Sequence, residues 1–187
     1  MNRWILLSSV VVLAGCSSST SSGDGDSDGD GDGETEGVSA DASGEPDDAT
    51  LNGIVKAHNE VRAEVGTEPL EWSSEVAGVA KAHAEKCNWG HSTERNGYGE
   101  NLFMTTGSAS ASDVVGSWAD EKKSYDPKTG ECSGVCGHYT QIVWNSTRKL
   151  GCAMAKCDTG NPMGSGPWEY WVCNYDPPGN YSGQKAF

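Results

Sequence analysis

The sequence predicts an α+β domain in which helices lie on both sides of a mostly antiparallel sheet. Two observations lead to this fold class: apolar residues recur at helical spacing early in the domain, and two β-type stretches lie near its end. Helices on either side of an antiparallel sheet fit this order. Residues 50–187 are about 138 residues, which is the size of one ordinary domain.

Two helices are expected at the start of this domain. The first would place on one face Leu51, Ile54, Val55, His58, Val61, Arg62 and Val65. Gly66 and Pro69 should end it. The second is marked by Trp72, Val76, Val79, Ala80 and His83, and should run to about Lys86. Because His58 and His83 lie beside apolar residues on these faces, we interpret both as structural.

The middle of the domain should contain a loop, a strand and a third helix. Residues 88–106 are rich in Gly and polar residues and are expected to form a loop with a short strand at 101–104. Ser112 or Asp113 is expected to cap the third helix, which should stop at Pro127. Its inner face would consist of Val114, Val115, Trp118, Glu121, Lys122 and Tyr125. A carboxylate on that face is costly unless it is paired or bound to a metal, so Glu121 is a candidate site residue. The alternative is a buried structural acid that is bonded to His138 or to the backbone.

The last third of the domain should supply most of the sheet. Residues 138–144 are expected to form a short fourth helix or an extended turn. Residues 150–156 and 168–175 are predicted strands, separated by a turn rich in Gly and Pro.

The first fifteen residues have the pattern of an export signal. Arg3 precedes an apolar run at 4–13, which is too short to span a bilayer, and small residues follow it. Residues 13–16 (LAGC) are similar to the lipobox of bacterial lipoproteins. That resemblance implies a diacylglyceryl group on Cys16, membrane attachment through this lipid, and a place in the cell envelope, at the outer membrane if the cell has one. The alternative is ordinary cleavage, which would release an extracellular protein.

Residues 16–49 are expected to form a disordered acidic linker. Residues 17–49 hold eleven of the 27 acidic residues and no Lys or Arg, so the net charge of −14 falls to −4 for residues 50–187. The alternating Asp residues at 24–32 do not match a calcium-binding EF-hand loop, because the Glu required at its twelfth position is absent in every register. A domain with a net negative charge and no stripe of basic residues is not expected to bind nucleic acid.

Six cysteines remain for the domain once Cys16 is set aside: Cys87, Cys132, Cys136, Cys152, Cys157 and Cys173. The close pairs are spaced C-x3-C and C-x4-C, unlike the C-x2-C knuckles of zinc sites, and an exported chain meets conditions that permit disulfides. We therefore predict three disulfides. Spacing alone leaves all fifteen pairings open.

Two long segments carry a family resemblance: residues 137–147 (GHYTQIVWNST) and 172–181 (VCNYDPPGNY). They resemble the two signature segments of the CAP superfamily, which includes cysteine-rich secretory proteins, antigen 5 of venoms and class-1 pathogenesis-related proteins of plants. Shorter matches at 58–62, 69–72, 90–92 and 99–102 extend the resemblance over 50–187. It implies a three-layer α-β-α sandwich with an open cleft. It also implies the disulfides Cys87–Cys157, Cys132–Cys136 and Cys152–Cys173.

The same resemblance implies a cleft lined by two histidines and two carboxylates, namely His91, Glu100, Glu121 and His138. Neutral imidazoles are good ligands for divalent ions, so His91 and His138 are the expected ligands of a metal, with zinc the first choice. Glu100 and Glu121 could be further ligands, could orient the histidines, or could act as bases. Ser92 follows His91 directly, but adjacency in sequence does not make a catalytic triad.

Three functions follow from this reading. The first is a binding module that takes a metal and a sterol, fatty acid or other small ligand. Apolar surface for such a ligand would come from Trp89, Tyr98, Phe103, Trp144, Trp168, Tyr170 and Trp171. The alternative, which we prefer, is that most of these residues belong to the core. The second is a non-catalytic envelope scaffold, and the third is a metal-dependent hydrolase of extracellular polymers. No residue is assigned a catalytic role, and binding is preferred to enzymatic activity.

Overall fold

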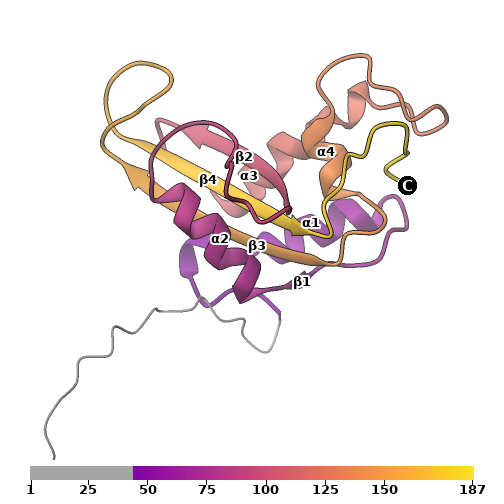
Figure 1. Ribbon diagram of the computed structural model, residues 1–187, viewed down its shortest axis with the longest axis horizontal. Coiled ribbons are helices and arrows are strands. Elements are labelled where there is room, and N and C mark those ends of the chain that lie inside the picture. Colours follow the sequence, from indigo (N-terminus) through magenta and orange to yellow (C-terminus); the bar gives the residue numbers. More distant parts are fainter. Residues whose placement is uncertain (1–43) are drawn as a thin grey trace, which may run out of the picture. The chain divides into compact units, whose positions relative to one another are not determined.

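A computed structural model describes residues 44–187 of the chain. The predicted export signal at 1–15, the predicted lipidation residue Cys16 and nearly all of the predicted acidic linker lie outside this described part. Figure 1 shows the elements in chain order. They are η1 (Ala49–Leu51), α1 (Ile54–Ala63), β1 (Glu71–Trp72), α2 (Ser74–Ala84), β2 (Gly99–Thr105), α3 (Ala111–Ala119), η2 (Asp120–Ser124), α4 (Gly137–Ile142), β3 (Lys149–Cys157) and β4 (Trp168–Asp176). Within 44–187, none of the helices has the length and apolar character needed to cross a membrane.

The sheet has four strands in the order β1-β3-β4-β2. β3 and β4 form a long antiparallel hairpin, and β2 pairs antiparallel with the other side of β4. β1 is a two-residue strand parallel to β3. The sheet is therefore mostly antiparallel, as predicted, with β4 in its interior and buried along nearly all of its length.

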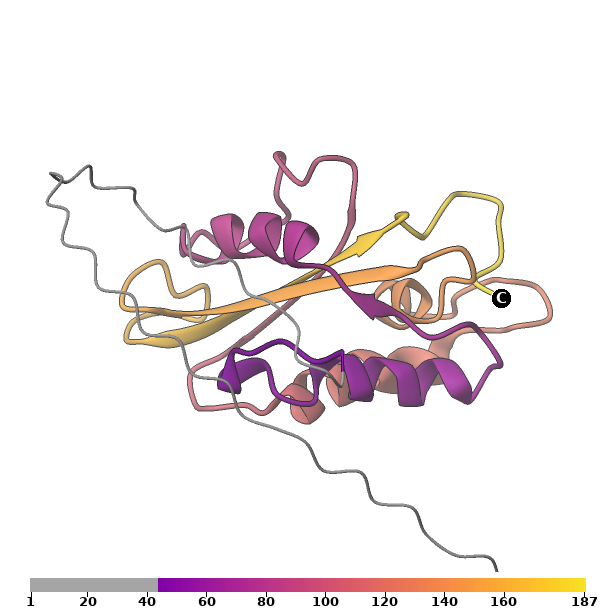
Figure 2. The same cartoon turned by 90° about the horizontal axis from the view of Figure 1, so that it is seen from below.

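Helices cover both faces of this sheet. Figure 2 shows α2 on one face and α1 with α3 on the other, which confirms the three-layer α-β-α sandwich. Alternate side chains of β4 point to opposite faces of the sheet. Trp171 and Tyr175 pack in the core on the side of α1 and α3. Tyr170 and Val172 pack in the core on the side of α2. On β3, a Cβ added to Gly151 would lie 2.1 Å from the backbone nitrogen of Ala77, so glycine is needed for the close approach of α2.

Several helix boundaries differ from the sequence prediction. The first helix begins at Ile54, and Leu51 lies in the separate 3-10 helix η1. The third helix, expected to run to Pro127, ends at Ala119, and Glu121 lies on the 3-10 helix η2 that follows it.

Trp72, expected in the second helix, belongs to β1, and α2 follows Ser73, whose hydroxyl accepts a hydrogen bond from the backbone of Val76. The expected cap of α3 at Ser112 or Asp113 is wrong, because Ser110 is the N-cap. Its side chain and that of Asp113 form a reciprocal capping box, which satisfies the free N–H groups earlier than expected.

Buried polar residues fix α1 against the rest of the domain. The guanidinium of Arg62 is fully buried and donates to four backbone carbonyls, those of Glu68, Ile142, Trp144 and Thr147.

His58 donates from Nδ1 to the carbonyl of Ile54 and accepts at Nε2 from the hydroxyl of Tyr175, at 2.7 and 2.9 Å. Desolvation by burial lowers the pKa of His58 to about 4, so its ring is neutral. The buried, neutral and fully hydrogen-bonded ring agrees with the structural role expected for His58.

The start of α1 is completed by a residue just before the domain. Its N-cap, Gly53, offers no side-chain cap, but the carboxylate of Glu45 accepts from the backbone nitrogens of Val55 and Lys56 at 3.1 and 2.5 Å. A negative group at a helix N-terminus is stabilising because it meets the free N–H groups and the positive end of the dipole. Residues 44–49, placed at the end of the linker in the sequence analysis, thus include one that contacts the helix.

The three predicted disulfides are confirmed: Cys87–Cys157, Cys132–Cys136 and Cys152–Cys173. Cys152 and Cys173 are directly paired on β3 and β4, where they join the two central strands within the core. Cys87–Cys157 joins the end of the α2 segment to the end of β3. Cys132–Cys136 closes the short loop before α4.

Candidate functional site

The first His–carboxylate pair lies where η2 meets α4. Nδ1 of His138 lies 2.6 Å from Oε1 of Glu121, and Oε2 of the same carboxylate accepts the backbone N–H of His138 at 2.8 Å. The N–H of Tyr139 contacts Oε2 at 3.4 Å. Trp118 stacks on the imidazole, with ring centroids 6.0 Å apart and planes inclined by 18°. Glu121 therefore fixes the ring of His138 and also binds the start of its helix.

The second pair lies between the loop after α2 and the start of β2. Nδ1 of His91 lies 2.8 Å from Oε1 of Glu100, which also accepts the backbone N–H of Ser92 at 2.9 Å. The Glu100 side chain is 1% exposed, whereas that of His91 is 59% exposed. A buried carboxylate thus holds an imidazole that faces the solvent.

Both histidines have the same local arrangement. An ionised carboxylate can only accept, so in each neutral ring the hydrogen bond places the proton on Nδ1 and leaves the lone pair on Nε2. The orientation of a metal-ligating imidazole by a carboxylate on its other nitrogen is a common feature of metal sites. Each pair is therefore suited to present Nε2 of a histidine as a ligand.

β2 connects the two pairs. Asn101 follows Glu100, and its Nδ2 donates to the backbone carbonyl of His138 at 3.0 Å. Within residues 44–187, no group of three or more His, Cys, Asp or Glu side chains is arranged to hold a metal ion. The four residues implied by the family resemblance are therefore present as two separate His–Glu pairs on neighbouring elements.

A cavity of about 390 Å³ lies beside the first residue of β2. Its lining includes His91, Glu100, Arg95 and Gln141, together with several glycines. A Cβ on Gly99 would lie 2.1 Å from Oε1 of Gln141, so the strand and the amide approach closely only because of glycine. Arg95 and Gln141 were not identified from the sequence, although Gln141 lies in the first signature segment.

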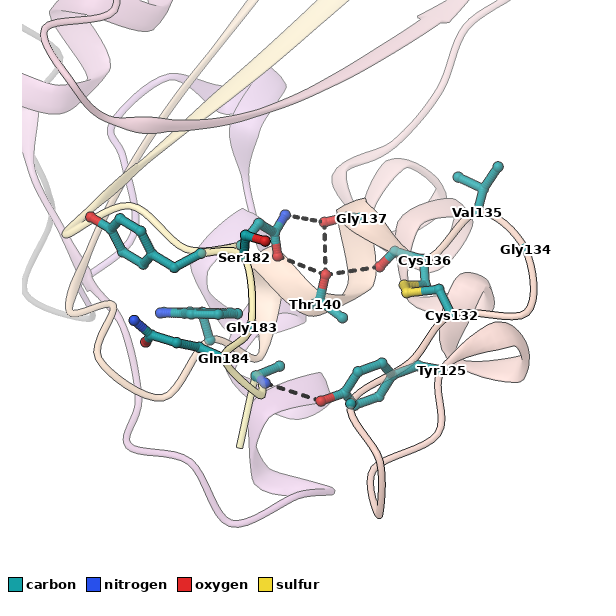
Figure 3. A pocket seen from close by; sticks show the side chains of 15 residues that line it. Tyr125, Cys132, Gly134, Val135, Cys136, Gly137, Thr140, Ser182, Gly183 and Gln184 are labelled. Carbon is teal, nitrogen blue, oxygen red and sulfur yellow. Dashed lines mark hydrogen bonds between the residues drawn. A yellow bond between two sulfur atoms is a disulfide. The ribbon is translucent and has the colours of Figure 1, made fainter.

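A larger cavity of about 490 Å³ lies between the Cys132–Cys136 loop and the C-terminal segment (Figure 3). We call it the C-terminal cavity. Val135 is 70% exposed and lies on the loop side, and Tyr181, which is 48% exposed, also lines it. Tyr125 and Trp144 contribute buried aromatic surface. Sequence reasoning identified Trp144 but not this cavity, which depends on segments that are about 50 residues apart.

Most aromatic residues considered as surface for a ligand are in the core. Trp144, Trp168, Tyr170 and Trp171 are buried, and of the seven only Trp89 is classed as exposed. Trp168, Tyr170 and Trp171 lie on β4 and pack in the two core clusters, and Trp144 packs in the core beside the C-terminal cavity. The expectation that most of the seven residues belong to the core agrees with these four.

Ser92 does not pair with the Nδ1 atom of its neighbour. Its hydroxyl accepts the backbone N–H of Glu94 at 3.0 Å, while Nδ1 of His91 is bonded to Glu100. His83, interpreted as structural, is buried and bonds through Nε2 to the carbonyl of Gly90 and the hydroxyl of Tyr170.

A three-layer sandwich with three disulfides and two His–Glu pairs at the start of β2 and beside α4 is the arrangement expected of a CAP domain. The chain belongs to this family: the model of "CAP: Cysteine-rich secretory protein family" matches residues 55–175. Membership of a family of secretory proteins supports export of the chain.

Individual relatives agree with this assignment. The chain is 42% identical over 137 residues to "Pathogenesis-related protein 1" of Arabidopsis thaliana, covering 71% of this chain and 80% of that protein. It is 43% identical over 138 residues to "Pathogenesis-related protein 1A" of Nicotiana tabacum, with 70% and 77% covered. Among solved structures, NaASP2 with Zn²⁺ superposes with a TM-score of 0.66 at 25% identity, covering 80% of this chain and 90% of that one.

Proposed function

We propose that this CAP domain binds a divalent cation, with zinc the first choice, through Nε2 of His91 and of His138. The observation that carries this proposal is the repeated geometry of the two pairs, in which a carboxylate is hydrogen bonded to Nδ1 and leaves Nε2 available as a ligand. Imidazole nitrogen is a preferred ligand of zinc, and the carboxylates would orient the rings rather than ligate.

The donor set fits a site that stays open. Two imidazoles leave coordination positions for water or for a ligand, and a bound divalent ion supplies a Lewis acid at such positions. NaASP2, a related fold, has been solved with Zn²⁺, which supports the choice of ion. Binding, rather than turnover, is the activity we propose, because the geometry of both pairs supports ligation through Nε2.

Titration calorimetry with zinc chloride tests this proposal. We expect one ion per chain and loss of binding in both His91→Ala and His138→Ala. Asp120→Asn and Glu94→Gln alter exposed acids near the two pairs without touching the rings, so they are the matched controls. Two ions per chain, each lost with one histidine, would show two separate sites, and an absence of heat at millimolar zinc would overturn the proposal.

We further propose that the C-terminal cavity holds a hydrophobic ligand such as a fatty acid or sterol. Its support is the combination of volume, buried aromatic lining and two exposed apolar residues, Val135 and Tyr181. Delipidated protein should take up a labelled fatty acid or sterol saturably, and Val135→Arg with Tyr181→Arg should abolish uptake. Met163→Arg is the control, since Met163 is 78% exposed on another loop. Equal uptake by all variants would exclude this cavity.

We also propose that Cys16 carries the lipid anchor of the mature protein, which would place the domain on the cell envelope at the end of its acidic linker. The lipobox-like sequence at 13–16 supports it. Metabolic labelling with an alkyne fatty acid should mark the wild type and not Cys16→Ser. Label on the Cys16→Ser protein, or a wild type that is released unlabelled, would contradict it.

A further inference from the structure

Three buried polar atoms stand out on the α2 side of the sheet. In the described part of the chain, Oε2 of Glu100 and both Oδ1 and Nδ2 of Asn174 are buried without a hydrogen-bond partner. An unsatisfied buried polar atom costs about 1–3 kcal/mol, and more if it is charged. Native proteins therefore rarely leave such atoms unpaired, and three of them on two residues require a common explanation.

The sheet register places these two residues side by side. Glu100 of β2 is the direct partner of Asn174 of β4 in the antiparallel ladder. Directly opposite residues project from the same face with Cβ atoms about 4.5–5.5 Å apart. The Asn174 side chain is fully buried, because α2 approaches the next strand closely at Gly151, which is the partner of Asn174 on β3. The unpaired donor and the unpaired carboxylate oxygen thus share one enclosed position.

The two oxygens of Glu100 have very different surroundings. Oε1 accepts from Nδ1 of His91 and from the backbone of Ser92, whereas Oε2 receives no donor. A carboxylate held at one oxygen can rotate, and its rotation would move the imidazole that depends on it. A donor at Oε2 would fix the plane of the group.

We propose that Asn174 is the positioning residue of the His91–Glu100 pair, and that it acts through ordered water enclosed between β2, β4 and α2. One water accepts from Nδ2 of Asn174 and donates to Oε2 of Glu100. Oδ1 of Asn174 needs a further donor, so we expect a second water beside the first. Buried waters typically make about three hydrogen bonds to polar groups that would otherwise be unsatisfied, and this position offers such groups.

Asn174, in the middle of the sheet, thus fixes the plane of the Glu100 carboxylate. The carboxylate in turn fixes the orientation of the His91 ring at the surface. The part of this inference that concerns zinc rests on the proposed function. The part that concerns the ring of His91 does not, because the position of the imidazole proton can be observed without any metal.

The variants are Asn174→Leu, which keeps the approximate volume but removes donor and acceptor, and Asn174→Ser, which keeps a hydroxyl and room for water. Asn101→Leu is the matched control, since Asn101 is equally buried on the same sheet but donates to His138 on the other side. The primary readout is the ¹⁵N chemical shifts of the His91 ring, which report whether the proton is on Nδ1 or Nε2. A high-resolution crystal structure of the wild type reports the waters.

We expect wild type, Asn174→Ser and Asn101→Leu to keep the His91 proton on Nδ1, and folded Asn174→Leu to show a mixture of both tautomers. Zinc affinity should fall about tenfold in Asn174→Leu, the lower end of the effect of removing a partner of a ligating histidine. In the Glu100→Gln background, the same substitution should have no further effect on the His91 shifts.

Two results would overturn the inference: an unchanged His91 tautomer in folded Asn174→Leu, or a crystal structure in which Asn174 and Glu100 have no water between them. A wild type with the waters and the Nδ1 tautomer that does not bind zinc would refute the proposed function and leave this inference intact.

Discussion

Oε1 of Glu121 lies 2.6 Å from Nδ1 of His138, and Oε2 of the same carboxylate accepts the backbone N–H of that histidine at 2.8 Å. One side chain thus fixes both the ring and the backbone of a residue that is 17 positions away. Because His138 is the second residue of α4, Glu121 also supplies the N-terminal acceptor that this helix lacks, since Cys136 makes no side-chain cap. Site geometry and helix stability therefore depend on the same carboxylate.

Replacing Glu121 should separate these two effects. Glu121→Gln keeps an oxygen that can accept one of the bonds, so we expect a folded protein whose zinc affinity is about 10–100-fold weaker. Glu121→Ala should in addition lower the free energy of unfolding by about 1–2 kcal/mol, because the start of α4 loses its acceptor. Calorimetry and urea denaturation measure the two quantities. Equal zinc affinity in wild type and Glu121→Gln would contradict an orienting role.

Acid should destabilise the domain through His58. Its pKa is about 4 in the folded state against 6.5 for the exposed group, so the unfolded chain binds more protons between these values. The stabilising contribution is complete above pH 6.5 and is lost as the pH falls toward 4, by about 3 kcal/mol in total. Urea denaturation at a series of pH values measures this. In His58→Gln the fall over that window should be smaller by this amount, and parallel curves for the two proteins would refute the assignment.

The three disulfides should differ in their effect on stability. In the chain-entropy model the stabilisation grows with the length of the closed loop. The linked residues are 70 positions apart in Cys87–Cys157, 21 in Cys152–Cys173 and 4 in Cys132–Cys136. Replacing Cys87 and Cys157 by Ser should cost about 4 kcal/mol, and replacing Cys132 and Cys136 about 2 kcal/mol. Thermal unfolding of the paired variants tests the order. A Cys132/Cys136 variant that is the less stable of the two would contradict the entropic account.

Gly151 should be the glycine least tolerant of substitution on the α2 face. Gly151→Ala brings a Cβ to 2.1 Å from the backbone of Ala77, so α2 must move, with an expected loss of about 1–3 kcal/mol. Gly78→Ala is the matched control on α2 itself: it has open space around the new Cβ, and should stabilise by about 0.4–1 kcal/mol. If the melting temperatures of both variants change in the same direction, the close contact between Gly151 and Ala77 does not decide which residue is tolerated at position 151.

Much of the fold could be predicted from the sequence because its signals are local. The spacing of apolar residues located the helices and the β3–β4 hairpin, and the family resemblance implied the pairing of the cysteines. β1 could not be predicted, since two residues carry no periodicity and their strand exists only because β3 lies beside them. The beginning of α3 was misplaced because several capping residues lie close together, and only the reciprocal bonds of Ser110 and Asp113 distinguish them.

The residues of the candidate site could be predicted from the sequence, but the pairing of each histidine with a carboxylate could not. The family resemblance identified His91, Glu100, Glu121 and His138, and the structure shows which histidine meets which carboxylate. Asn174 lies within the second signature segment, yet nothing in its local sequence indicates that it faces Glu100. That relationship arises from strand register, which joins residues 74 positions apart.

The position of β4 has a consequence for the order in which the sheet forms. This strand is the last in chain order, yet it lies between β3 and β2 and carries buried side chains to both layers. A chain that has not yet delivered residues 168–176 therefore lacks one of the two central strands of its sheet, and β2 has no strand to pair with. Residues 99–105 must wait for a segment about 70 positions later in the chain before their backbone is hydrogen bonded in the sheet.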